Sequence, residues 1–162
     1  MATNITDFVN VGEKIANLGG VYPHGLALLP VNFESASSLA ELRQASEAAT
    51  IKKLLIAEGL QVDDILDRSQ RPPYIKNKSH EWASPIIFVS ALLYSQNPMC
   101  ISLALNVLGN YATDFFRGTN TTPNVKLNIV IEKKDKSCKT ISYEGPVDGL
   151  KDLPNIVREA AE

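Results

Sequence analysis

The sequence is poor in the residues that most often carry out chemistry or hold metals in proteins. It has two histidines, His24 and His80, and two cysteines, Cys100 and Cys138. No two of these four residues lie within five positions of each other, whereas structural zinc sites draw their ligands in closely spaced pairs. The sequence also lacks a G-x-S-x-G nucleophile motif and any glycine-rich phosphate-binding motif. We therefore predict no catalytic residue, no metal site and no cofactor.

An excess of charge of either sign is also absent. Sixteen Lys and Arg residues face eighteen Asp and Glu residues, which gives a formal net charge of -2. Lysines gather in one predicted turn, 133–139, but Glu132 and Asp135 are interleaved with them, and lysines at sheet edges commonly prevent aggregation. This balance excludes a strongly basic nucleic-acid binder, so we predict no nucleic-acid partner.

A secretory signal is missing from the first residues, which have neither a basic segment nor an apolar one. We therefore expect a cytoplasmic protein in which Cys100 and Cys138 are free thiols. With 44% hydrophobic residues, the chain can bury a core without disulfides. Its length predicts a single domain over residues 1–162.

The most unusual absence is that of charge in the middle of the chain, where no charged residue occurs over 82–113. Asn97 and Pro98 divide this run, and proline is favoured in the first turn of a helix. The pattern predicts a helical hairpin over about 83–117, with helices at 83–95 and 98–117. Apolar residues form two stripes along the second helix, which predicts burial on two sides.

Period-two alternation marks the end of the chain. It predicts strands at 125–131 and 139–143 joined by a polar turn, and a third strand at 26–33. Weaker helical spacing predicts a helix over 5–18, and a capping box at Ser38–Glu41 predicts the start of another. The predicted fold class is α+β: a helical core around the central apolar hairpin, a small antiparallel sheet, and a polar loop at 61–80.

The favoured functional hypothesis is a non-enzymatic interaction or assembly module. It would self-associate or dock on a larger protein partner through the hairpin. Asn106 and Asn110 lie four residues apart on an otherwise apolar helix. If buried, they need hydrogen-bond partners, either across a dimer, as a buried Asn has in a coiled coil, or in the backbone of the fold. The predicted interface residues are Trp82, Phe88, Asn106, Asn110, Tyr111 and Phe115.

Two alternatives stay open. One is a small hydrolase-like enzyme in which His24, Glu34 and the acidic cluster at 63–67 converge beneath the 61–80 loop. The other is a membrane-active effector that inserts residues 82–116. A spanning helix needs about 20 apolar residues, and each half of the hairpin is shorter, so the pattern disfavours a membrane partner without excluding it.

Three sequence blocks suggest a biological setting. In chain order they read ISLALNVLGNYATDFFRG, VKLNIVIEK and TISYEGPVDGLKDLPNIVRE. They resemble small bacterial proteins that are encoded as accessory partners of larger effector proteins. The resemblance covers about the C-terminal third of the chain and includes no catalytic signature. It implies an accessory protein of a bacterial effector or defence system.

Overall fold

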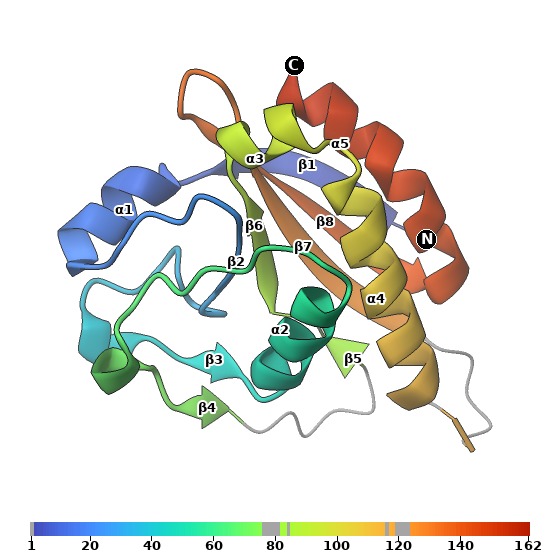
Figure 1. Ribbon diagram of the computed structural model, residues 1–162, viewed down its shortest axis with the longest axis horizontal. Coiled ribbons are helices and arrows are strands. Elements are labelled where there is room, and N and C mark those ends of the chain that lie inside the picture. The colour runs from blue at the N-terminus through green and yellow to red at the C-terminus, as the bar shows by residue number, and fades with distance from the viewer. Residues whose placement is uncertain (1, 76–81, 84, 116, 119–123) are drawn as a thin grey trace.

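The computed structural model describes residues 2–75, 82–83, 85–115, 117–118 and 124–162, and a mixed sheet lies at its centre (Figure 1). Five strands follow one another across this sheet in the order β1–β8–β7–β6–β2, and the short β5 pairs with β7 next to β6. Most neighbours are antiparallel, but β6 and β5 run parallel to β7. The strands are β1 (Ala2–Phe8), β2 (Leu26–Leu29), β5 (Trp82–Ala83), β6 (Ile86–Val89), β7 (Asn124–Glu132) and β8 (Cys138–Pro146).

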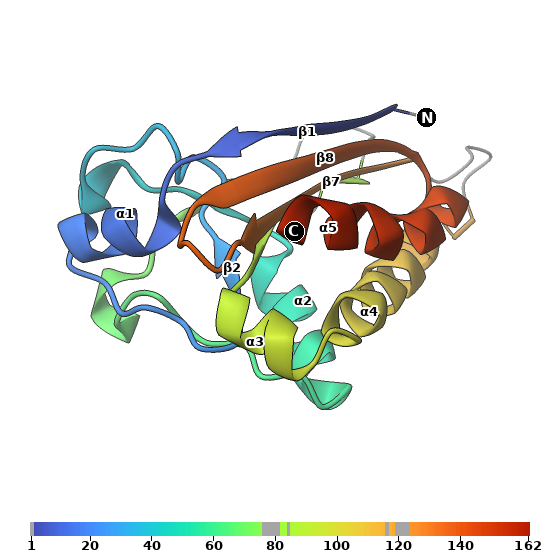
Figure 2. The same ribbon diagram turned by 90° about the horizontal axis from the view of Figure 1, so that it is seen from above.

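One face of the sheet is covered by a layer of helices (Figure 2). These helices are α2 (Ala48–Ala57), α3 (Ala91–Gln96), α4 (Cys100–Phe115) and α5 (Leu153–Ala161), with a 3-10 helix, η3 (Val147–Asp152), before α5. Apolar side chains from β7 and β8, including Leu127, Ile129 and Ile141, pack there against α4 residues such as Leu108. Because every second strand residue points to this face, the alternation in the sequence identifies its core residues.

The opposite face is covered at one end. There α1 (Val11–Leu18), residues 30–42 and residues 65–66 enclose a second core that contains Phe33, Phe88 and Val130. Figure 2 shows no helix over the part of this face that β1 and β8 form. Thr6 and Thr140, paired across those two strands, lie there, and a polar strand face suits contact with water.

The predicted fold class is confirmed as α+β, but the sheet, and not a helical hairpin, is central. Residues 83–95 are not one helix. They form part of β5, then β6, then the short α3. Ile86–Val89 is a run of β-branched and aromatic residues that lies between β2 and β7, and both of its faces are covered. The second half of the uncharged run is a helix, as predicted, over Cys100–Phe115.

The three predicted strands correspond to β2, β7 and β8, although the first ends at Leu29. It also pairs with β6 instead of the hairpin. The prediction of one helix over 5–18 is wrong, because residues 2–8 form β1 along the edge of β8 and α1 begins only after Asn10. Asn10 caps α1 by accepting a hydrogen bond from the Glu13 amide at 2.9 Å.

The described part of the predicted 61–80 loop spans residues 61–75. It contains a turn of 3-10 helix, η2 (Arg68–Gln70), and the two-residue strand β4 (Tyr74–Ile75), which pairs with β3 (Gln44–Ala45). Ile65 and Leu66 are buried in the second core, so this segment is anchored to the fold and only its outer side is polar.

Candidate functional site

The six predicted interface residues lie in different environments. Phe88 is 0% exposed and packs in the second core, where it has no surface to offer a partner. The backbone of Trp82 pairs with Val125 in the sheet, and its side chain is outside the described residues. Phe88 was expected at an interface because its run is uncharged, but a buried strand between two others is equally uncharged.

Tyr111 and Phe115 lie in the last turns of α4. Tyr111 is partly buried, and its hydroxyl donates a hydrogen bond to the carboxylate of Glu47, next to the start of α2. Burial, and next the hydrogen bond and negative charge of Glu47, raise the pKa of Tyr111 to about 12. This phenol therefore joins α4 to α2, whereas Phe115 is exposed.

Asn106 and Asn110 are exposed, so the expectation that α4 is buried on two sides is wrong. Their amides have water as a partner and need none in the core. Leu103, from the second apolar stripe, is 37% exposed. The helix packs on the sheet with one side only, because no further layer of the described elements covers the helices (Figure 2).

The exposed side of α4 has a regular composition. Asp114 and Phe115 are exposed near its C-terminal end. Five other residues, the first directly before the helix, are separated by four, three, four and three positions, which places them on one line along a helix. All of them are uncharged and exposed, and Met99, at the start of the line, is 63% exposed. We call this line the α4 stripe; it consists of Met99, Leu103, Asn106, Asn110 and Thr113.

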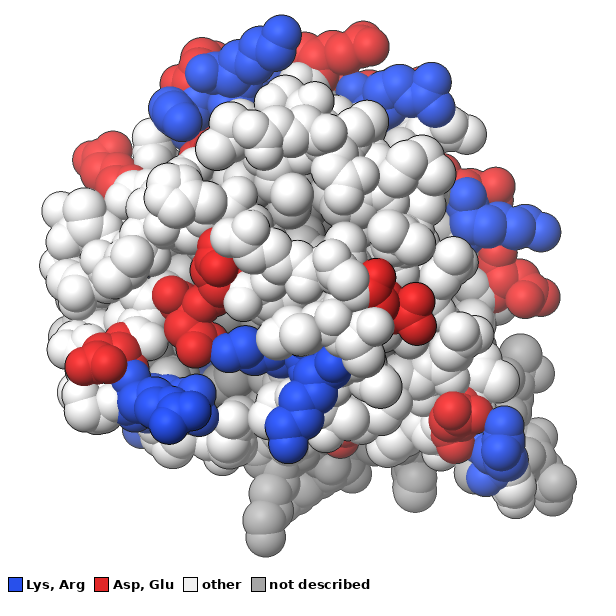
Figure 3. Space-filling model, in the orientation of Figure 1, with Lys and Arg blue, Asp and Glu red and all other residues white. Residues whose placement is uncertain are grey.

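Charged groups lie to the sides of the α4 stripe. A groove of about 510 Å³ runs between α4 and η3, with Asn106 and Asn110 on one wall and Asp148 and Lys151 on the other. The space-filling view shows largely uncharged surface over α3 and α4, with separate acidic and basic side chains beside it (Figure 3). The α4 stripe is therefore an uncharged strip of surface with a polar groove beside it.

The groups of the enzyme hypothesis do not form a catalytic arrangement. Asp63 does meet His24, but it accepts hydrogen bonds from the backbone amides of His24 and Gly25, at 3.0 and 2.8 Å, and none from the imidazole. Glu34 offers its backbone carbonyl to Lys14, and no contact joins its carboxylate to His24 or Asp63. Asp63 therefore fixes the loop before β2, a structural task.

The hydrogen bonds to Asp63 make a prediction for acid stability. Burial acts to raise the pKa of this carboxyl, but the hydrogen bonds from Gly25, Gln61 and His24 outweigh it and hold the pKa below its usual value. A carboxyl with a lowered pKa stabilises the fold above its unfolded-state pKa, and this stabilisation is lost as the pH falls through the folded-state value.

We expect Asp63→Asn to be less stable than the wild type at pH 7, and the difference to shrink as the pH falls below about 4. Urea unfolding of both proteins at several pH values measures this. A difference that stays constant down to pH 3 would show that the charge of Asp63 is not what stabilises the loop.

A pocket of about 360 Å³ opens between α2 and the 61–75 segment. Apolar side chains form part of its wall, Gln44, Asp63 and Asp64 add polar groups, and four cations line it: Lys52, Lys53, Arg68 and Arg71. In Figure 3, Lys and Arg side chains gather in the lower part of the face, with Asp and Glu side chains beside them. We call this the α2 pocket; the residues used below are Leu28, Ala49, Lys52, Lys53, Ile56, Asp63, Asp64, Ile65, Leu66, Arg68 and Arg71.

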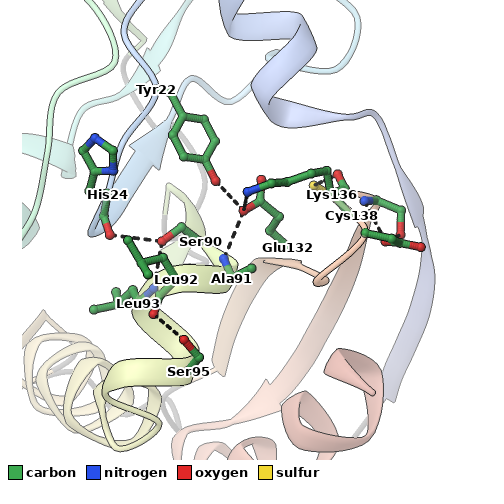
Figure 4. Close-up of polar contacts among 12 residues, drawn as sticks. Tyr22, His24, Ser90, Ala91, Leu92, Leu93, Ser95, Glu132, Lys136 and Cys138 are labelled. Carbon is green, nitrogen blue, oxygen red and sulfur yellow. Dashed lines mark hydrogen bonds and ion pairs between the residues drawn. The ribbon is translucent and has the colours of Figure 1, made fainter.

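Glu132, the last residue of β7, is 2% exposed and forms a second polar centre (Figure 4). Its Oε1 atom accepts hydrogen bonds from the Tyr22 hydroxyl and, at 3.0 Å, from the Ala91 amide at the start of α3. The preceding Ser90 caps α3 and donates to the His24 carbonyl at 3.1 Å. Oε2 of Glu132 is buried without a hydrogen-bond partner among the described residues. The Glu132 network, which comprises these residues, thus ties β7, α3 and the loop before β2 together.

Lys136 completes the surroundings of Glu132 from the β7–β8 turn. Its Nζ atom lies 3.9 Å from Oε1 of Glu132 and 5.7 Å from the centre of the Tyr22 ring. The backbone of Lys136 is left-handed, with φ of 74°, a conformation that is costly for lysine. Burial, and next the hydrogen bond to Glu132, raise the pKa of Tyr22, so the phenol stays protonated and donates.

The Glu132 network leaves only a weak trace in the sequence. Tyr22 and Glu132 are 110 positions apart, and only the folded sheet brings them together. One weak signal is that Glu132 continues the alternation of β7 in phase with Val130, a buried residue. That phase places the carboxylate on a covered face, where burial requires partners.

Both cysteines are free and buried, and they lie in the two separate cores. Burial raises the pKa of each thiol to about 11, which makes both poor nucleophiles. Among the residues that the structure describes, no three His, Cys, Asp or Glu side chains gather as metal ligands. None of the described helices is long and apolar enough to cross a membrane.

A comparison with protein-family models, curated proteins and solved structures finds nothing that matches this chain. The likeness of the C-terminal blocks to bacterial accessory proteins therefore stays a prediction. What the chain offers for a functional assignment is its own surface: the α4 stripe, the α2 pocket and the Glu132 network.

Proposed function

We propose that this chain is a non-enzymatic assembly module that pairs with a second copy of itself through the α4 stripe. The observation that carries this proposal is the spacing and chemistry of the five exposed residues from Met99 to Thr113. Separations of four and three residues are those of the seam of a two-helix coiled coil. A helix side with this spacing suits another helix as its partner.

The chemistry of the α4 stripe favours a second copy over a charged partner. The side-chain amides of Asn106 and Asn110 each carry a donor and an acceptor, so they can pair with the same groups of another copy. An uncharged strip also meets its own copy without repulsion between like charges. Met99 and Leu103 supply the apolar contact, and an asparagine in such a seam fixes the register of the two helices.

The proposed setting follows from the sequence. The resemblance of the C-terminal blocks implies an accessory protein beside a larger bacterial effector or defence protein, and a dimer would present two identical surfaces to such a partner. Two free, buried thiols in separate cores suit a reducing compartment, so the cytoplasm is part of the proposal.

The test is the mass of the protein in solution. We expect sedimentation equilibrium of the wild type to approach twice the chain mass of 17.7 kDa as concentration rises. Leu103→Glu places a charge in the α4 stripe, where pairing would bury it opposite its own copy. We expect this variant to weaken the association by about a hundredfold or more.

The matched control is Ile56→Glu, because Ile56 is 49% exposed on α2 and lies outside the α4 stripe. This variant is expected to associate like the wild type. A wild type that stays monomeric at high concentration, or an equal effect of both substitutions, would contradict pairing through α4. If the protein is monomeric alone but binds a larger partner, the stripe is a docking surface for that partner instead.

A further inference from the structure

We infer that the α2 pocket binds a small organic anion with an apolar body. This inference is independent of the assembly proposal, because the pocket shares no residue with the α4 stripe. It rests on the size of the pocket, on the apolar part of its wall and on the cations at its mouth.

One part of the pocket wall is apolar. Leu28 from β2, Ile65 and Leu66 from the segment before η2, and the half-exposed Ile56 from α2 line it, and Gln44 adds a polar side chain. Leu66 is buried in the second core, so this part of the wall is held in place by the fold. A volume of about 360 Å³ lies in the usual range for small-molecule sites and holds a body such as a bicyclic aromatic ring.

Two cations at the mouth are neutralised by the protein itself. Nζ of Lys52 lies 2.7 Å from Oδ1 of Asp64, and Arg71 approaches the other oxygen at 3.9 Å. The remaining carboxylate of the pocket, Asp63, is engaged by backbone amides. Neither carboxylate is therefore placed to neutralise the other two cations at the mouth.

These other two cations are Lys53, from α2, and Arg68, from η2. Neither forms an ion pair within the part of the chain that the structure describes. Two unpaired cations beside an apolar wall favour a ligand with an oxyanion at one end and an apolar group at the other. Carboxylates and phosphate monoesters share this chemistry, and binding measurements distinguish the two.

Isothermal titration calorimetry with 1-naphthyl phosphate, 1-naphthoate and the neutral 1-naphthalenemethanol tests the inference. We expect at least one of the anions to bind with a dissociation constant of about 1 mM or tighter. The neutral alcohol is expected to bind at least about tenfold more weakly, because it lacks the charge. The anion with the lower dissociation constant identifies the head group, phosphate or carboxylate, that the site prefers.

Two variants separate the charge from the cavity. Lys53→Gln with Arg68→Gln is expected to weaken anion binding about tenfold or more, whereas the control pair Lys133→Gln with Lys134→Gln in the β7–β8 turn leaves it unchanged. Ala49→Phe fills the pocket from an exposed position of α2 and is expected to reduce binding of anion and alcohol alike.

Leu103→Glu is expected to leave ligand binding unchanged, since the α4 stripe and the pocket are separate. Three outcomes would overturn the inference: no saturable binding of either anion up to about 10 mM, equal binding of anion and alcohol, or equal effects of the Lys53–Arg68 pair and its control.

Discussion

Replacing Phe88 with alanine is expected to lower the free energy of unfolding by about 3–5 kcal/mol. Phe88 is 0% exposed in the middle of β6 and packs in the second core beside Val130 and Phe33. Its ring also meets that of Tyr22 edge to face, with 6.4 Å between the ring centres. Removing the ring leaves a cavity that close-packed neighbours fill only in part.

Urea unfolding measures this loss in the free energy of unfolding. The control is Leu92→Ala, because Leu92 is a large apolar residue of the same uncharged run and is exposed on α3. That variant is expected to lose less than about 1 kcal/mol. Equal losses in the two variants would contradict the placement of Phe88 in the core. Such a result would support the prediction from the uncharged run that Phe88 lies at an interface.

Glu132→Ala is expected to cost about 2–3 kcal/mol. The substitution removes the acceptor of both the Tyr22 hydroxyl and the Ala91 amide. The amide lies at the start of α3 and has no other partner in the described structure, so it would be left without a hydrogen bond. The loss is thus attributed to unpaired groups, not to lost apolar contact.

Glu132→Gln separates the hydrogen bonds from the charge. Its amide oxygen can take the place of Oε1 and accept from both donors. Its NH₂ group replaces Oε2, which is buried without a partner among the described residues, so we expect a loss of about 1 kcal/mol, smaller than that of Glu132→Ala and measured by the same urea unfolding. A loss from Glu132→Gln as large as that from Glu132→Ala would show that the negative charge, through Lys136 for instance, holds the network together.

Alternation in the sequence predicts part of this fold, whereas the capping-box prediction is wrong: Ser38 makes no side-chain cap, and only a 3-10 turn over Leu39–Glu41 follows it. Val125, Leu127, Ile129 and Ile131 point to one face of β7, and a strand with one face on a helical layer must alternate in this way. Helix α5 has Pro154 in its first turn, a position that proline favours. The spacing of apolar residues is enough to predict these elements, because each has one side on an apolar layer and the other side in water.

The uncharged run shows where such rules fail. Ile86–Val89 is apolar at every position, so its period cannot separate a buried strand from a buried helix. In β1, Ile5 and Phe8 have helix-like spacing, but pairing with β8 decides the structure of this edge strand. Propensity is a weak signal when a long-range partner is available.

The candidate surfaces depend on tertiary structure in the same way. Both apolar stripes of α4 look equally suited to burial in the sequence. In the described structure no helix lies on the outer side of α4, so only one stripe is covered (Figure 2). Asn106 and Asn110 are on the surface of the single chain, which rules out the alternative that they are buried within the fold; their burial in a dimer stays part of the assembly proposal. The cations of the α2 pocket come from separate elements, so no spacing rule connects Lys53 with Arg68.

Chemical cross-linking at the α4 stripe tests the central claim most directly. Both native thiols are buried with pKa values raised to about 11, so a cysteine introduced on the surface is the thiol that reacts. Asn106→Cys lies at the middle of the stripe, and Asn17→Cys on the exposed side of α1 is a control of the same residue type. Paired helices pack with axes about 8–10 Å apart, within reach of a short bismaleimide.

We predict that the bismaleimide joins two copies of the Asn106→Cys protein in high yield at a concentration where the wild type is dimeric. The Asn17→Cys protein is predicted to stay uncrosslinked under the same conditions, and adding Leu103→Glu to Asn106→Cys is predicted to abolish the product. Equal yields at positions 106 and 17, or a yield at position 106 that Leu103→Glu leaves unchanged, would contradict assembly through α4.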